Sequence, residues 1–162
     1  MSVVLIGMPS SGKSTVGVIL AKRLGLKFVD TDLLIQEQQG QLLCELIARM
    51  GPEGFSRLEN ELLAKLCEKN AVISTGGSAV YCHEGMKNLK TLGRVVYLDI
   101  SYGEMVERLG DYEHRGIVMK QGQTLADIYA ERQVLYSRYA DVTVCAENRS
   151  ISKTVDEIIS KL

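Results

Sequence analysis

The stretch Gly7-Met8-Pro9-Ser10-Ser11-Gly12-Lys13-Ser14 decides the fold of this chain. It matches the pattern G-x-x-x-x-G-K-[ST], the phosphate-binding P-loop. Residues 3–6 before it, Val-Val-Leu-Ile, are a short apolar run typical of a strand that is buried on both faces. After it, apolar residues at 16, 19, 20 and 24 share one helical face, and Gly25 sits where a helix ends. This order of strand, glycine loop and helix is the one that the motif requires.

The chemistry of the motif explains its residues. Glycines permit a backbone path in which several N–H groups point inward at phosphate oxygens. The helix that follows adds unpaired N–H groups and the positive end of its dipole. Lys13 brings a cation to the β- and γ-phosphates, and the Ser14 hydroxyl is the usual Mg²⁺ ligand. We therefore expect a nucleotide phosphate site at the start of the chain.

Length and composition exclude several classes of protein. A chain of 162 residues with 46% hydrophobic residues predicts one globular domain. With a net charge of −1 and no basic run, we expect neither nucleic acid nor a membrane surface as a partner. No apolar run is as long as a membrane span, and the first strand starts too early for a signal peptide. Four scattered cysteines with no C-x-x-C pair argue against zinc. We expect a cytoplasmic monomer.

Strand and helix patterns alternate along the chain, which predicts a parallel sheet with helices on both faces. The expected strands lie near residues 3–7, 27–30, 71–75, 94–99 and 141–145. The expected helices lie near residues 13–24, 32–39, 42–49, 53–69, 83–91, 102–109, 124–138 and 151–161. Residues 32–69 are too long for one crossover and predict an inserted helical lobe. Residues 110–123 are polar and contain glycine, which in a compact domain indicates a functional loop, here a lid.

The triplet Asp30-Thr31-Asp32 ends the second predicted strand. The carboxyl ends of parallel strands line the ligand crevice of open α/β sheets. Alternate residues of an extended strand point to the same side, so we expect both carboxylates beside the phosphates. One would hold Mg²⁺, and the other would orient an attacking hydroxyl or accept its proton. A polar strand end or a helix cap is the structural alternative.

Other candidate site residues follow later strands. Ser74-Thr75-Gly76-Gly77-Ser78 comes after the third strand, where adjacent glycines let backbone N–H groups approach a ligand. Arg108, Arg115 and Arg132 are candidate cations of the site. Arg115 lies in the predicted lid, within reach of a transferring phosphate. Arg132 is suited to bidentate carboxylate binding.

These pieces, in this order, resemble shikimate kinase, a family of the P-loop nucleoside-monophosphate-kinase-like group. The resemblance covers nearly the whole chain. It rests on the P-loop and on six further stretches: Phe28-Val29-Asp30-Thr31-Asp32, Gly54-Phe55…Glu59, Thr75-Gly76-Gly77, Val95–Asp99, Arg108-Leu109 with Arg115, and Arg132…Leu135-Tyr136 through Asp141. It implies a three-layer P-loop kinase fold and transfer of phosphate from ATP, with Mg²⁺, to the 3-hydroxyl of shikimate.

The resemblance also implies roles for particular residues. Lys13, Asp32 and Arg115 would be catalytic, and Ser14 and Asp30 would hold Mg²⁺. The ATP site would consist of Pro9, Ser10, Ser11, Gly12, Lys13, Ser14, Thr15, Arg108 and Arg115, with Arg108 packed on adenine. The acceptor site would consist of Asp32, Ser56, Arg57, Gly76, Gly77, Ser78 and Arg132, with Arg132 on the carboxylate.

Three positions depart from the family pattern. The family motif Phe-Arg-x-x-Glu, whose arginine grips the shikimate carboxylate, reads here Phe55-Ser56-Arg57-Leu58-Glu59. Arg57 cannot simply replace the missing arginine, because one residue turns a helix by about 100°. The family's third glycine is Ser78, and the lid's Arg-Pro is Arg115-Gly116. Two of these departures fall on the acceptor side.

Shikimate therefore has rivals as the acceptor, such as a hydroxylated amino acid like homoserine or a sugar acid. A nucleotide-binding switch without an acceptor is a further class. The chain has no Asn-Lys-x-Asp motif, which argues against a guanine-nucleotide switch. A homologue that binds without transfer is a third class, and the presence of Lys13, Ser14, Asp30 and Asp32 argues against it.

Restoring the arginine tests the register of this motif. Ser56→Arg should lower the KM for shikimate by about ten- to one-hundredfold, because one charge-assisted hydrogen bond contributes roughly 1.5–3 kcal/mol. Steady-state kinetics with varied shikimate would measure the change. An unaltered KM would mean that the assignment of position 56 to the pocket is wrong.

Overall fold

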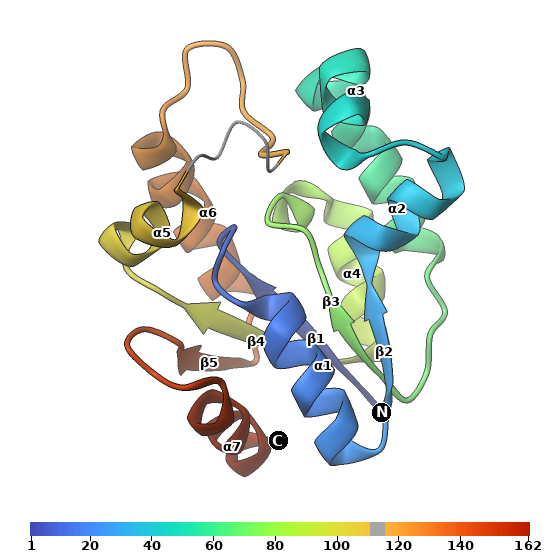
Figure 1. Cartoon of the computed structure of the whole chain (residues 1–162). Helices are drawn as coiled ribbons and strands as arrows, with labels where there is room; N and C mark the ends of the chain where they lie inside the picture. Colours follow the sequence, from blue (N-terminus) through green and yellow to red (C-terminus); the bar gives the residue numbers. More distant parts are fainter. Residues whose placement is uncertain (111–115) are drawn as a thin grey trace.

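A computed structural model describes residues 1–110 and 116–162 (Figure 1). Its strands form a single parallel sheet with the order β2-β3-β1-β4-β5. The strands are β1 Ser2–Gly7, β2 Lys27–Asp30, β3 Ala71–Ser74, β4 Gly93–Asp99 and β5 Val142–Cys145. The predicted five-stranded α/β fold is therefore confirmed, and every strand lies within one residue of its predicted bounds.

Helices cover both faces of this sheet, with α1 and α7 packed together on one face and α4 and α6 on the other (Figure 1). The helices are α1 Lys13–Leu24, α2 Thr31–Gln39, α3 Leu43–Lys65, α4 His83–Leu92, α5 Tyr102–Leu109, α6 Leu125–Tyr139 and α7 Ile151–Lys161. A short 3₁₀ helix, η1 Ala79–Tyr81, was not predicted. The result is the expected three-layer arrangement.

Strand β1 is the centre of the molecule. It pairs with β3 on one side and with β4 on the other, and its six residues are all buried. Burial on both faces accounts for the uninterrupted apolar run at residues 3–6. Because all five strands are parallel, their carboxyl ends lie at one edge of the sheet, toward the top and left of Figure 1. Helices α2 and α3 and the loop before α6 stand above this edge.

The lobe at residues 32–69 differs in detail from the prediction. Element α3 consists of two helical segments separated by non-helical backbone at Gly51 (φ +72°) just before Pro52, which agrees with the two helices expected over 42–49 and 53–69. The second segment, however, ends at Lys65 rather than at residue 69. The Asn88 side-chain amide donates to the carbonyl oxygens of Leu63 (2.8 Å) and Leu66 (2.7 Å), which a continuing helix would need for itself.

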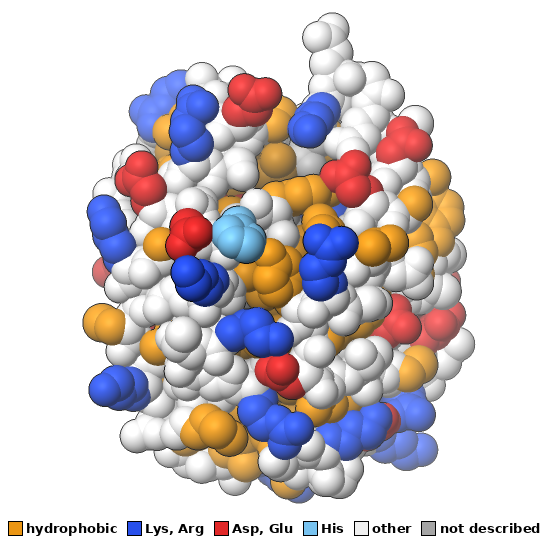
Figure 2. All heavy atoms as spheres, turned by 180° about the vertical axis from the view of Figure 1, so that it is seen from behind, with side chains coloured by type: hydrophobic (Ala, Val, Ile, Leu, Met, Phe, Trp, Pro, Cys, Tyr) orange, Lys and Arg blue, Asp and Glu red, His pale blue; other side chains and the backbone are white. Residues whose placement is uncertain are grey.

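The face made by α4 and α6 carries cationic, anionic and hydrophobic side chains interspersed with one another (Figure 2). Single exposed hydrophobic residues of this kind are normal on a folded domain. Among the described residues, no helix is both long and apolar enough to cross a membrane.

The packing of α4 on α3 yields a prediction about stability. A Cβ atom at Gly85 would lie 2.6 Å from the Cβ of Leu63, whereas one at Gly103 would meet nothing within 4 Å. Gly85→Ala should lower the free energy of unfolding by about 1–3 kcal/mol through overpacking. The matched control Gly103→Ala should lose none, because alanine is the better helix former. Urea unfolding would compare the two, and equal stability of both variants would contradict this account of the contact.

Candidate active site

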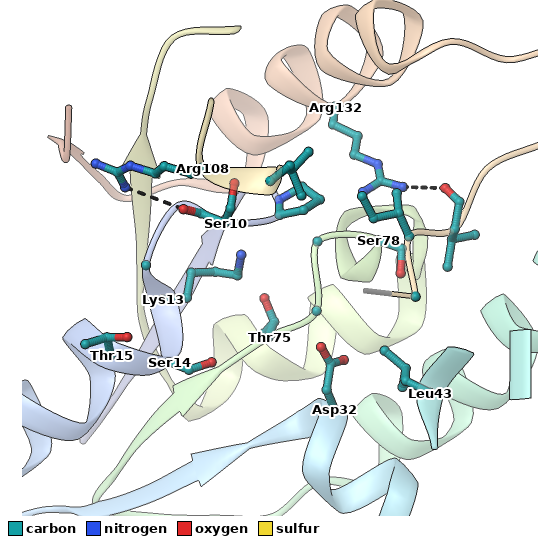
Figure 3. A pocket seen from close by; sticks show the side chains of 18 of the residues that line it. Ser10, Lys13, Ser14, Thr15, Asp32, Leu43, Thr75, Ser78, Arg108 and Arg132 are labelled. Carbon is teal, nitrogen blue, oxygen red and sulfur yellow. Dashed lines mark hydrogen bonds between the residues drawn. The ribbon is translucent and has the colours of Figure 1, made fainter. Parts of the chain in front are cut away.

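A cavity of about 410 Å³ lies at the carboxyl edge of the sheet (Figure 3). It is bounded by the β1–α1 loop, the start of α2, the turn after β3, the end of α5, the segment before α6, and α6 itself. The predicted site residues that line it are Pro9, Ser10, Gly12, Lys13, Ser14, Thr15, Asp32, Gly76, Gly77, Ser78, Arg108 and Arg132. The fold therefore brings candidates from five separate segments to one place.

The β1–α1 loop has the backbone that its sequence predicts. Ser10 and Gly12 adopt the left-handed region, with φ of +63° and +91°. A Cβ at Gly7 would lie 2.6 Å from the carbonyl oxygen of Leu98, so only glycine fits there. The Lys13 ammonium is buried and donates to the carbonyl oxygens of Gly7 (2.9 Å) and Met8 (2.8 Å). The Lys13 ammonium thus lies inside the curve of the loop backbone.

Burial lowers the pKa of the Lys13 amine to about 8, although the neighbouring Asp32 carboxylate opposes the shift. A buried ammonium with only carbonyl and hydroxyl partners gains when an anion arrives. The arrangement favours binding of phosphate oxygens at Lys13.

The side chains of Asp30 and Ser14 are joined by a short hydrogen bond. The Ser14 hydroxyl donates to Asp30 Oδ2 at 2.6 Å, while Asp30 Oδ1 accepts from the backbone N–H groups of Asp32 (3.0 Å) and Leu33 (3.4 Å). Asp30 is therefore the N-cap of α2, whereas the cap considered from the sequence was Asp32, which lies inside the helix. In the part of the chain that the structure describes, no cluster of three or more His, Cys, Asp or Glu side chains could hold a metal ion.

Asp32 reaches the cavity by a route different from the predicted one. Strand β2 ends at Asp30, so Asp32 lies in the first turn of α2 and not on an extended strand. Its carboxyl group lines the cavity opposite Lys13 (Figure 3). Burial raises the pKa of Asp32 to about 6, the Asp30 carboxylate adds to the rise, and Lys13 opposes it. A carboxylate with this pKa is suited to accept a proton near neutral pH.

The turn after β3 forms the wall beside Asp32. An ideal Cβ at Gly77 would lie 3.1 Å from Arg132 Nη1 and 3.0 Å from Pro9, so the turn passes close to both. The Tyr136 hydroxyl donates to the carbonyl oxygen of Gly77 at 2.6 Å. This bond ties the turn to α6, which also carries Arg132.

Arg132 is a buried cation with unused donors. Its side chain is 1% exposed, and its Nη2 donates to the carbonyl oxygen of Val118 at 2.8 Å. Its guanidinium lies over the Tyr81 ring, 5.4 Å from the centroid. Within residues 1–110 and 116–162, Nε has no hydrogen-bond partner and no carboxylate pairs with this arginine. Leaving such a group unpaired is costly, so the site favours an anion at Arg132.

Arg108 is held at the opposite end of the cavity. Its guanidinium pairs with Glu104 one turn earlier on α5 (Nη2 to Oε1, 2.6 Å). It also donates to the carbonyl oxygens of Ser10 (3.4 Å) and Ala146 (3.1 Å). These contacts present a planar cation beside the P-loop (Figure 3).

Other predicted site residues lie outside the cavity lining. Ser11 is buried beside Lys13, and Asp30 accepts a hydrogen bond from Ser14, which does line the cavity. Ser56 lines a smaller neighbouring cavity of about 220 Å³ with Tyr81 and Lys120, and Arg57 is exposed on α3. Arg115, with the part of the predicted lid at 111–115, lies outside the described residues. The following lid residues Gly116, Ile117 and Val118 do line the large cavity.

Some lining residues were missed at the sequence level. Thr75 was seen only as part of the glycine turn, and its hydroxyl bonds the Leu5 carbonyl oxygen at 2.9 Å. Leu43 and Phe55 come from the lobe, and Leu109 from the end of α5. The sequence does not distinguish an apolar helix residue that lines a cavity from one that packs in the hydrophobic core.

Known proteins resemble this chain over its whole length. The family model described as shikimate kinase matches residues 9–162. The chain belongs to the shikimate kinase family. The shikimate kinase of Symbiobacterium thermophilum is 37% identical over 167 residues, covering 100% of this chain and 96% of that protein. That of Mycobacterium avium is 39% identical, covering 98% and 92%.

Solved structures agree with the sequence comparison. A shikimate kinase from Acinetobacter baumannii in complex with shikimate superposes with a TM-score of 0.91 at 28% identity, covering 99% of this chain and 91% of that one. Membership of the shikimate kinase family makes this protein a phosphotransferase that acts on a hydroxyl group. The P-loop kinase fold inferred from the resemblance is confirmed.

The raised pKa of Asp32 predicts a stability effect. Between about pH 4 and 6 the folded protein keeps a proton that the unfolded chain releases, so stability falls as pH rises through this interval. Asp32→Asn should therefore raise the free energy of unfolding at pH 7.5 by about 1–3 kcal/mol, and the gain should vanish below pH 4.

A control of opposite sign is available. Hydrogen bonds from Thr124 lower the pKa of Asp127, so Asp127→Asn should lose stability at pH 7.5. Urea unfolding at several pH values would measure both variants. No gain for Asp32→Asn at pH 7.5 would contradict the electrostatic account of the site.

Proposed function

We propose that this protein transfers the γ-phosphate of ATP to the 3-hydroxyl of shikimate, giving shikimate 3-phosphate and ADP. The supporting observation is a single cavity that contains the P-loop cation Lys13, the carboxyl group of Asp32 and the buried cation Arg132. A phosphate donor, a hydroxyl and a carboxylate each have a matching group in that cavity. The proposal agrees with family membership.

On the nucleotide side, backbone N–H groups of the P-loop and the α1 N-terminus would bind the phosphates, with Lys13 near the β- and γ-groups. The guanidinium of Arg108 would pack on adenine; its bonds to Glu104 and Ser10 keep it in place. Arg115 would neutralise charge on the transferred phosphoryl group, a role that stays a proposal from sequence.

Ser14 and Asp30 would hold Mg²⁺, Asp30 through water. Two adjacent oxygen atoms, 2.6 Å apart, suit a hard cation that keeps most of its water. When bound, the ion supplies charge neutralisation for the phosphates. Asp30 is fixed through Oδ1 by the α2 N–H groups that it caps, so its other oxygen, Oδ2, stays directed at Ser14.

For transfer, Asp32 would accept a hydrogen bond from the acceptor hydroxyl. The hydroxyl oxygen attacks the γ-phosphorus, the bond from that phosphorus to the β–γ bridging oxygen breaks, and ADP leaves. The hydroxyl proton passes to the Asp32 carboxylate, whose raised pKa lets it receive the proton. Residues Gly116–Val118 border the reacting groups and would help to exclude water, which would otherwise hydrolyse ATP.

Arg132 would bind the carboxylate of the acceptor. A second acceptor class, another hydroxylated acid such as homoserine or a sugar acid, remains a candidate because Ser56 replaces the family arginine. The small side chain of Ser56 borders the 220 Å³ cavity and supplies no second cation for the acceptor carboxylate. We propose that shikimate is nevertheless the acceptor, held mainly by Arg132.

We further propose that the protein acts in the cytoplasm as a monomer. Cys44, Cys67, Cys82 and Cys145 are free thiols, which is typical of a reducing compartment.

The function is tested by ADP release with Mg-ATP against a panel of shikimate, quinate, homoserine and several sugar acids. Shikimate should give the highest kcat/KM. Lys13→Ala should reduce transfer by at least about a thousandfold, because charge stabilisation in the site is lost. The matched control Lys22→Ala, an exposed lysine on α1, should keep wild-type activity.

Efficient turnover of another panel member with little use of shikimate would replace the acceptor in this proposal. Hydrolysis of ATP that no acceptor stimulates would favour the nucleotide switch instead.

A further inference from the structure

A fully buried carboxyl group stands behind the acceptor side of the cavity and has no part in the mechanism above. Glu59, on α3, is 0% exposed. Its Oε2 accepts a hydrogen bond from the Ser78 hydroxyl at 2.6 Å, with the Cys82 thiol 3.9 Å away. Its Oε1 has no hydrogen-bond partner within the described part of the chain. Such a group needs a structural or functional reason, since burying it is costly.

The second oxygen of Glu59 lies close to the backbone of Gly76, as does a carboxyl oxygen of Asp32. An ideal Cβ at Gly76 would lie 2.8 Å from Glu59 Oε1 and 2.7 Å from Asp32 Oδ1. The two carboxyl groups therefore approach the same backbone position, and any side chain at 76 would collide with both. Burial, with Asp32 nearby, raises the pKa of Glu59 to about 7, although the bond from Ser78 opposes the rise.

Glu59 is held by a hydroxyl and not by a cation. No lysine or arginine among residues 1–110 and 116–162 forms an ion pair with it, and Arg132 acts on it only through the wider field. One turn earlier on α3, position 56 is serine, and its backbone carbonyl oxygen accepts from the Cys82 thiol at 3.7 Å. Residues three apart share a helix face, so a long cation at 56 would lie beside Glu59. The hydrogen bond that Glu59 accepts comes from the Ser78 hydroxyl and not from a side chain at position 56.

The bond joins two parts of the acceptor site. Ser78 belongs to the turn that lines the cavity, whereas Glu59 belongs to the helical lobe. The same turn is fixed from the other side by the Tyr136 hydroxyl, which donates to the Gly77 carbonyl oxygen. The turn is thus held between α3 and α6, with Asp32 adjacent at Gly76.

We propose that the Ser78–Glu59 hydrogen bond is a positioning device for the acceptor: it fixes the Gly76–Ser78 turn, and with it the place of Asp32, in a pocket that has no cation at position 56. This inference rests on the proposed function. Ser78 and Glu59 are positioning residues here. The Ser78 hydroxyl donates its hydrogen bond to Glu59 on α3 and not to the acceptor.

Three variants test this device. Ser78→Ala removes the donor and should raise the acceptor KM about tenfold, while the KM for ATP changes less than twofold. Glu59→Gln keeps an oxygen that accepts from Ser78 and should stay within threefold of the wild-type acceptor KM. Ser2→Ala is the matched control: this buried hydroxyl donates to the Glu68 carbonyl oxygen at the far end of β1. It should lose stability without changing either KM.

The outcomes separate the two proposals. No acceptor turnover by the wild-type protein would overturn the proposed function and this inference together. Normal wild-type turnover with an unchanged acceptor KM in Ser78→Ala would overturn this inference alone. Equal rises in both KM values, matched by Ser2→Ala, would also overturn it, because they would show a general loss of folding.

Discussion

Parallel pairing of β1 with both of its neighbours is the constraint on which the rest of the structure depends. Because β3 and β4 run in the same direction as β1, and β2 runs in the same direction as β3, the loops after these four strands emerge at one edge. The P-loop, the Gly76–Ser78 turn and the start of α2 therefore meet around one cavity. The apolar run at residues 3–6 keeps β1 buried in the middle of the sheet, and so holds these loops around the cavity. The positions of the site residues therefore depend on the burial of β1.

Much of the fold was predictable because its signals are local. Alternating patterns located all five strands, and the P-loop residues located the turn between β1 and α1. Asp30, Asp32 and Arg132 were identified as site residues from their place after strands or on a helix. Asp32 was nevertheless reached by the wrong reasoning: α2 begins one residue earlier than predicted, so helix geometry and not strand alternation directs its side chain.

What the sequence could not supply was mostly contact between distant segments. Ser56 and Ser78 looked like two separate departures on the acceptor side, but they lie near the same carboxyl group, Glu59. The end of α3 at Lys65 depends on an amide from α4, 22 to 25 residues away. Such facts arise from packing, which no single stretch of residues encodes.

Arg132 links two walls of the cavity. Its Nη2 donates to the Val118 carbonyl oxygen, and its Nη1 lies beside Gly77 in the turn after β3. If an acceptor carboxylate binds to this guanidinium as proposed, the acceptor and residues 116–118 share a single cation. Anything that pulls the guanidinium toward the acceptor then alters the hold on Val118, and by thermodynamic reciprocity the reverse is equally true. Under that proposal, acceptor binding and the position of residues 116–118 are coupled through one side chain.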